Sequence, residues 1–269
     1  MRRRRAHACR RDAAARHSRR GARPHPARAP ASGLRAQPGA GIPRLVSVAL
    51  RSVAGAERPS ITAQGVWHRY GPGRGLEPVS FAWCGPSVAA VTGANGSGKS
   101  TLLKVLAGLV APSGGTATLS IGGSVVPNRA RRRCVGYASP DLMFYDELSC
   151  AENLAFAGEA LGLRDVRRAF TAALDQVGLG RVAEDRPGAL SSGMLQRLRL
   201  ALALLHGPAV LLLDEPTSHM DDEGRDLVAR VVERHRRAGL VVIASNDERE
   251  WRIAEQRIEL RGRGLGGAA

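Results

Sequence analysis

Residues 87–104 read SVAAVTGANGSGKSTLLK, and this stretch decides the fold of the chain. Residues 87–92 form a short run of small and β-branched residues between Pro86 and Gly93, which is typical of a buried strand. Apolar side chains then recur at three- and four-residue spacing over residues 100–110, and this spacing predicts a helix. The segment GANGSGKS between them fits the pattern G-x-x-x-x-G-K-S/T. It stands between a strand and a helix, as a phosphate-binding loop requires.

The parts of this loop have separate roles in binding a nucleotide. The glycines let successive backbone N–H groups point inward around a phosphate, and the start of the helix adds its dipole. Lys99 can reach the β- and γ-phosphates, and the Ser100 hydroxyl can ligate Mg²⁺. An ordinary glycine-rich turn is the alternative, and the correct flanking elements argue against it. The expected nucleotide-binding residues are Gly93, Ala94, Asn95, Gly96, Ser97, Gly98, Lys99, Ser100 and Thr101.

Two acids follow a second apolar run much later in the chain. Residues 211–213 are leucines, and Asp214 and Glu215 come directly after them. At the end of a strand, Asp214 can hold Mg²⁺ through water, and Glu215 can polarise the water that attacks a γ-phosphoryl group. A strand followed by two acids is common by itself. Only the phosphate-binding loop upstream makes a catalytic pair the better interpretation.

The sequence around residue 190 carries a family resemblance. Residues 190–197 read LSSGMLQR and open a predicted helix. They resemble the LSGGQ signature of ATP-binding cassette (ABC) proteins, with Ser192 in place of a glycine and Met194 in place of the glutamine. The resemblance implies that ATP is the nucleotide and that the signature of one subunit closes on the ATP of another. Ser191 and the amide of Gly193 would then contact the γ-phosphate in trans.

The resemblance to ABC proteins covers residues 61–261 and reaches further positions. Tyr70 matches the aromatic residue that stacks on adenine in that family. Residues 216–221 match the family's D-loop, and residues 145–154 match the start of its helical subdomain.

Two positions depart from the ABC pattern. Pro140 stands where the family has the glutamine of its Q-loop, so one ligand of Mg²⁺ and water is missing. Asn246 stands where the family has its γ-phosphate histidine; asparagine can still donate a hydrogen bond, but it is shorter and uncharged. We therefore expect Glu215, Lys99 and Asn246 to form the catalytic set, with ATP binding intact and hydrolysis weakened.

The order of predicted elements indicates an α/β fold. Together with the resemblance, it predicts a P-loop NTPase with an ABC-type β-subdomain, a parallel-sheet core and an inserted α-helical subdomain. The expected strands are 61–68, 79–84, 87–92, 116–121, 210–213 and 240–244. The expected helices are 100–110, 149–161, 166–177, 192–205 and 223–237. We assign residues 59–269 to this domain and about 141–207 to its helical subdomain.

Composition separates residues 1–58 from the rest. They contain 15 arginines, two acids and several prolines, and they show no apolar periodicity before residue 42, which predicts a disordered tail. Three explanations stay open: an arm that binds nucleic acid or anionic lipid, a transit peptide, or a translation start placed too early in a GC-rich gene. The tail has no aromatic residue on which bases could stack, so no specific nucleic acid is expected.

The resemblance also implies cofactors and partners. It implies ATP and Mg²⁺, a second ABC ATPase subunit that is identical or different, and an integral membrane permease. Apolar runs such as 45–50 and 210–213 are far shorter than the roughly 20 residues of a membrane span, so we expect a cytoplasmic protein that is peripheral on the inner face of the cell membrane. The four cysteines lack metal-binding spacing, so neither zinc nor disulfides are expected.

Three functions remain open at this point. The short single cassette resembles the haem-exporter type used in cytochrome c maturation, among other small-molecule exporters. A nucleotide-binding regulator with little hydrolysis is suggested by Pro140 and Asn246. A soluble ABC ATPase outside transport would usually carry two cassettes or long insertions, which this sequence lacks.

Overall fold

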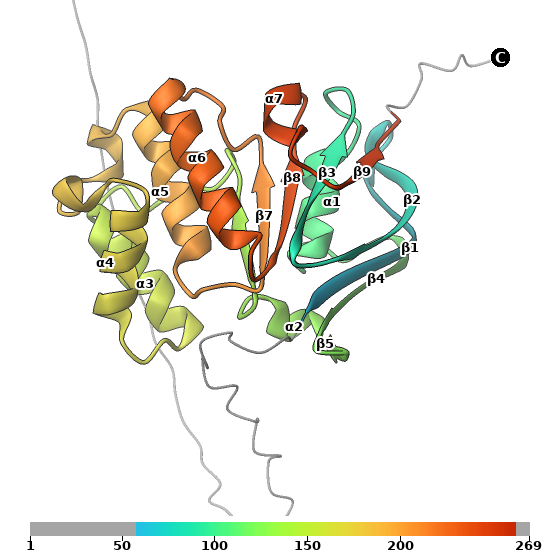
Figure 1. Cartoon of the computed structure of the whole chain (residues 1–269), viewed down its shortest axis with the longest axis horizontal. Helices are drawn as coiled ribbons and strands as arrows, with labels where there is room; N and C mark the ends of the chain where they lie inside the picture. Colours follow the sequence, from blue (N-terminus) through green and yellow to red (C-terminus); the bar gives the residue numbers. More distant parts are fainter. Residues whose placement is uncertain (1–57, 262–269) are drawn as a thin grey trace, which may run out of the picture. The chain divides into compact units, whose positions relative to one another are not determined.

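The computed structural model describes residues 58–261, which fold around two β-sheets (Figure 1). A five-stranded parallel sheet has the order β6-β7-β8-β3-β9, and a four-stranded antiparallel sheet has the order β2-β1-β4-β5. The parallel strands are β3 (Ser87–Thr92), β6 (Val135–Ala138), β7 (Val210–Asp214), β8 (Leu240–Ala244) and β9 (Gln256–Glu259). The antiparallel strands are β1 (Pro59–Gly71), β2 (Arg74–Cys84), β4 (Gly114–Ile121) and β5 (Ser124–Val126).

Seven helices accompany these strands in the described residues. They are α1 (Lys99–Leu106), α2 (Asn128–Arg131), α3 (Cys150–Leu161), α4 (Val166–Gln176), α5 (Ser192–Leu204), α6 (Asp222–His235) and α7 (Glu248–Trp251). Single 3₁₀ turns occur at Gly180–Val182 and Pro187–Ala189.

The centre of the parallel sheet is buried on both faces. Every residue of β3, β7 and β8 is buried, which explains why these strands are continuous apolar runs rather than alternating ones. Val241 of β8 pairs with Val88 of β3 on one side and with Leu211 of β7 on the other. Because the strands are parallel and in register, their carboxyl ends meet at one edge of the sheet, which is where ligands bind in this class of fold.

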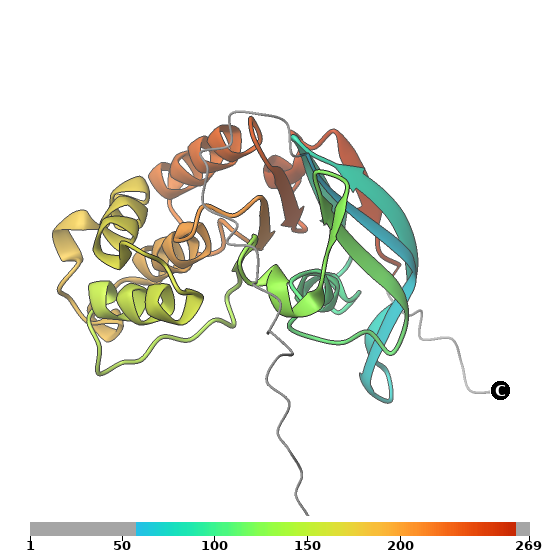
Figure 2. The same ribbon diagram turned by 90° about the horizontal axis from the view of Figure 1, so that it is seen from below.

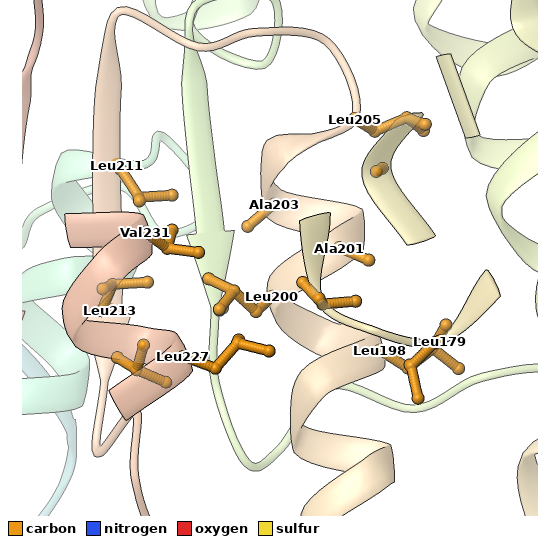
Figure 3. Close-up of a cluster of buried hydrophobic side chains, with 14 of the residues drawn as sticks. Leu179, Leu198, Leu200, Ala201, Ala203, Leu205, Leu211, Leu213, Leu227 and Val231 are labelled. Carbon is orange, nitrogen blue, oxygen red and sulfur yellow. The ribbon is translucent and has the colours of Figure 1, made fainter. Parts of the chain in front are cut away.

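Helices α3, α4 and α5 pack against one another, and α5 also packs on β6. Viewed from below, this helical group and the antiparallel sheet lie on opposite sides of the parallel sheet (Figure 2). The apolar cluster in Figure 3 joins α5 to the sheet: Leu200 and Ala203 lie close to Leu211 and Leu213 of β7, and Leu227 joins them from α6. The helix that carries the LSSGM segment is thus fixed against the strand that ends in Asp214.

One predicted helix is shorter than expected. The helix predicted over residues 100–110 ends at Leu106, because Gly108 adopts the left-handed φ of 76°. Leu109, which lies beyond the end of this helix, is 65% exposed.

The predicted disordered tail comprises residues 1–58, and residues 1–57 of it lie outside the described part of the chain. Within residues 58–261, no helix combines the length and the apolar character that crossing a membrane requires.

Candidate nucleotide site

The backbone of the phosphate-binding loop adopts positive φ values at three of its glycines. Gly93, Gly96 and Gly98 have φ values of 140°, 79° and 100°, a region that other residues rarely adopt. A Cβ atom on Gly98 would lie 2.8 Å from the carbonyl oxygen of Gly75, so glycine is also required by close packing. No side chain caps the start of α1, and its free N–H groups are therefore available to a phosphate.

Lys99 lies inside this loop. Its side chain is 7% exposed, and its ammonium group donates to the carbonyl oxygens of Gly93 at 2.9 Å and Ala94 at 3.4 Å. It also donates to Oδ1 of Asn246 at 2.8 Å and lies 3.9 Å from Oε1 of Glu215. The lysine is thus surrounded by oxygen acceptors at the position predicted for a nucleotide phosphate.

Asp214 ends β7 as a buried carboxylate beside α1. Burial raises its pKa, while a hydrogen bond from Ser100 and the charges of Lys104 and Lys99 act in the opposite direction. Its Oδ1 atom is buried and has no hydrogen-bond partner among residues 58–261. A hydroxyl beside a carboxylate with an unused oxygen fits the oxygen ligands that Mg²⁺ prefers.

Glu215 has an unusual backbone conformation for a non-glycine residue. Its φ is 47°, in the left-handed region, and its amide donates to the carbonyl oxygen of Ala244 at 2.9 Å. Burial raises the pKa of its carboxyl group, and the nearby charge of Lys99 lowers it. The carboxylate is still 36% exposed, so water can reach it.

Asn246 follows β8 and uses both ends of its amide in the site. Its Oδ1 accepts from Lys99, and its Nδ2 donates to Oδ1 of Asn95 at 2.5 Å. The fold therefore brings Lys99, Ser100, Asp214, Glu215 and Asn246 together at the carboxyl ends of β3, β7 and β8.

The remaining predicted site residues lie elsewhere on the surface. Ser191 caps α5 by accepting from the Met194 amide at 3.2 Å, and its side chain is exposed. A Cβ atom on Gly193 would lie 3.4 Å from the carbonyl oxygen of His219, so the LSSGM segment borders the loop that follows Glu215. Tyr70, near the end of β1, is 53% exposed and makes an edge contact with His68 at 4.5 Å. Among the described residues, none of these three hydrogen-bonds to the loop of residues 93–100.

Sequence reasoning missed a chain of contacts beside Glu215. Buried Gln196 donates to the carbonyl oxygens of Glu215 at 3.3 Å and Pro216 at 3.5 Å. Arg199 donates to Oε1 of Gln196 at 3.1 Å and to the carbonyl oxygen of Leu142 at 3.0 Å. The available signal was a glutamine on the buried stripe of α5, since a buried polar side chain needs partners.

The segment at Pro140 also has contacts that the sequence did not indicate. Pro140 is exposed, and Asp141 after it forms an ion pair with Lys104 of α1 at 2.9 Å. This contact raises the pKa of Lys104, chiefly through the hydrogen bond to Asp141. The segment is therefore tied to the helix that begins at the phosphate-binding loop.

A glycine loop around a buried lysine, with a hydroxyl and two acids beside it, defines a P-loop nucleotide-binding protein. Residues 76–218 match the family model described as ABC transporter. The chain belongs to the ABC transporter family, as an ATP-binding cassette with the ATPase activity of that family.

Two relatives illustrate this membership. The chain is 37% identical over 206 residues to the aliphatic sulfonates import ATP-binding protein SsuB 2 of Burkholderia cenocepacia (strain HI2424), covering 75% of this chain and 74% of the relative. It is 41% identical over 152 residues to the uncharacterized ABC transporter ATP-binding protein YxlF of Bacillus subtilis (strain 168), covering 56% of this chain and 50% of the relative. The matched region thus spans half the length of YxlF.

Solved structures confirm the fold. The dimeric MJ0796 cassette, a bacterial ABC transporter cassette, superposes with a TM-score of 0.66 at 23% identity, covering 75% of this chain and 94% of that one. An ATP-binding subunit of an ABC transporter gives 0.64 at 26% identity, covering 76% of this chain and 88% of that one. The predicted P-loop fold with a parallel sheet is therefore confirmed.

Proposed function

We propose that the chain is the ATP-hydrolysing subunit of an ABC transporter, which pairs with a second cassette around ATP and drives a separate membrane permease. The observation that carries the proposal is the meeting of Lys99, Asp214 and Glu215 at one edge of the parallel sheet, with the ammonium 3.9 Å from the Glu215 carboxylate. Such a site holds a phosphate, a metal and an attacking water close together.

Each group has a defined part in hydrolysis. Lys99 exchanges its chain oxygens for the β- and γ-phosphates. Ser100 and Asp214 would hold Mg²⁺, whose charge would offset the charge that develops on the phosphates. Glu215 accepts the proton of the attacking water, and its raised pKa suits a general base. Asn246 would redirect its Nδ2 donor from Asn95 to the γ-phosphate.

The second cassette is suggested by the position of the LSSGM segment. Ser191 is exposed and makes no hydrogen bond to the phosphate-binding loop in the described residues, so its own chain does not use it there. A second copy or a homologous cassette would bring an equivalent segment onto this ATP. The dimeric state of MJ0796 supports this arrangement by analogy.

The permease is suggested by apolar side chains on the helical side of the molecule. Met143 is 82% exposed, and Tyr145 and Phe156 are 55% and 53% exposed while touching edge to face. Exposed apolar clusters of this kind mark protein interaction sites. A permease bound there would place the protein on the inner face of the cell membrane. The prediction of a haem or other small-molecule exporter rests on the short single cassette and stays a prediction.

The central test is Glu215→Gln. This change removes the base and keeps the shape, so phosphate release should fall by about 10² to 10⁴ while ATP binding persists. In the presence of ATP, the Glu215→Gln protein should also accumulate as a dimer, which light scattering would measure. Glu159→Gln, at an exposed acid of α3, should keep the parent rate. A Glu215→Gln protein that hydrolyses at the parent rate would refute the assignment of the base. A parent protein that binds ATP without releasing phosphate would instead support the regulator.

A further inference from the structure

Helix α7 contacts the loop that follows Glu215. Oε1 of Glu250 accepts a hydrogen bond from the Thr217 amide at 2.9 Å, and it also accepts one from the Thr217 hydroxyl. Thr217 is buried, so water does not compete for these bonds. One carboxylate oxygen therefore fixes both the backbone and the side chain of a residue close to the proposed base.

A second contact from α7 reaches the far end of the same loop. Asp247 forms an ion pair with Arg225 at 3.7 Å, and Arg225 donates to the carbonyl oxygen of Met220 at 3.4 Å. Asp247 and Glu250 both follow Asn246 in the segment after β8. The loop of residues 216–221 is thus held near its start and near its end by the segment that also provides Asn246.

The backbone of this loop needs such restraint. Glu215 and His219 have φ values of 47° and 62°, and they are the two non-glycine residues with positive φ in the described part of the chain. Non-glycine residues in this region persist only where the surroundings hold them. Thr217 lies between these two positions, so its bonds to Glu250 support this backbone together with Gln196, whose side chain donates to the carbonyl oxygen of Glu215.

We propose that Glu250 is a positioning residue for ATP hydrolysis: by accepting both Thr217 hydrogen bonds, it holds the backbone turn that keeps the Glu215 carboxylate beside Lys99. The inference rests on the proposed role of Glu215 as the base. A misplaced base lowers the rate of the chemical step while nucleotide binding, which depends on the loop of residues 93–100, is unaffected.

The geometry predicts which substitutions of Glu250 are tolerated. Only Oε1 makes the two bonds, while Oε2 is buried without a hydrogen-bond partner among residues 58–261. The amide oxygen of glutamine can replace Oε1, and its NH₂ group would take the place of the unpartnered oxygen without breaking a bond. Glu250→Gln should therefore retain the positioning function, and Glu250→Ala should lose it.

The test measures phosphate release, ATP affinity and thermal unfolding of the full chain. Glu250→Ala should lower kcat about tenfold or more with the ATP dissociation constant within about twofold of the parent, and Glu250→Gln should stay within about threefold in kcat. Thr217→Val should lower kcat, and Thr217→Ser should keep it. Combining Glu250→Ala with Thr217→Val should cost no more than Glu250→Ala alone, because the two changes break the same contact.

Hydrogen exchange gives a readout that does not depend on activity. Amides of residues 217–220 should exchange faster in Glu250→Ala than in the parent, and Glu250→Gln should protect them. Glu248→Ala, at an exposed acid on the same helix, should match the parent in both measurements. A parent kcat in Glu250→Ala, equal losses in the Ala and Gln variants, or additive losses with Thr217→Val would each overturn the inference. The proposed base is tested separately by Glu215→Gln.

Discussion

Two histidines, buried His206 and half-buried His235, should make the stability of the folded domain depend on pH. His206 follows α5 and His235 ends α6, and burial lowers the pKa of each from 6.5 to about 4. The unfolded chain therefore binds more protons than the folded one between these values. The contribution of these two histidines to the free energy of unfolding is therefore fully present above pH 6.5, and it is lost as the pH falls towards 4.

The size of the effect follows from the pKa values. One pKa unit corresponds to about 1.4 kcal/mol, so each histidine can change the free energy of unfolding by about 3 kcal/mol at full protonation. At pH 5 the loss is about 2 kcal/mol for either ring taken alone. The charge of His206 also lowers the pKa of His235, so the two losses are coupled. A typical domain has only about 5–15 kcal/mol of stability, so the loss at pH 5 should be easy to detect.

Urea unfolding at pH 8 and pH 5 would measure the loss directly. His206→Leu should reduce the difference between the two pH values substantially, because it removes one of the two ionisable rings. His219→Asn is the control, since His219 is exposed and asparagine tolerates its left-handed φ of 62°. If His206→Leu keeps the full difference between pH 8 and pH 5, burial of His206 is not the cause.

Two further predictions concern Asn246 and the first 58 residues. Asn246→His should raise ATP turnover by up to about tenfold, because it strengthens one donor to the γ-phosphate, and Asn246→Ala should lower turnover because that donor is lost. Both variants should bind ATP about as well as the parent. An Ala variant with the parent turnover would show that Asn246 is no γ-phosphate ligand. Deleting residues 1–58 should leave the thermal midpoint and ATPase rate nearly unchanged while weakening salt-sensitive binding to DNA or anionic vesicles; a large loss of unfolding cooperativity would show that these residues belong to the folded domain.

The central strands of the parallel sheet could be predicted from the sequence because they are continuous apolar runs. The strands predicted at residues 87–92 and 240–244 coincide with β3 and β8, since a parallel strand buried on both faces must be apolar throughout. Short elements could not be predicted in the same way. β6, β9 and α7 have four residues each, and a window of that length shows no reliable period.

The site shows a similar division. The phosphate-binding loop and the acids after β7 are formed by residues that are adjacent in the sequence. Their residue types alone therefore predict the backbone and side-chain groups of this part of the site. The contact of Asn246 with Asn95 spans 151 residues, and that of Glu250 with Thr217 spans 33. The first contact depends on how β8 lies beside β3, and the second depends on how β8 lies beside β7. A single sequence does not reveal which polar side chains these arrangements pair.

The environment of Lys99 has a consequence for how nucleotide would enter and leave. Its ammonium group already has three oxygen partners from the chain, in Gly93, Ala94 and Asn246. A phosphate bound to Lys99 would therefore compete with these oxygens, and its negative charge would decide the exchange rather than any gain in the number of hydrogen bonds. When the products depart, the lysine can return to the same carbonyl and amide oxygens. The ammonium group would then have oxygen partners from the protein both before and after each turnover.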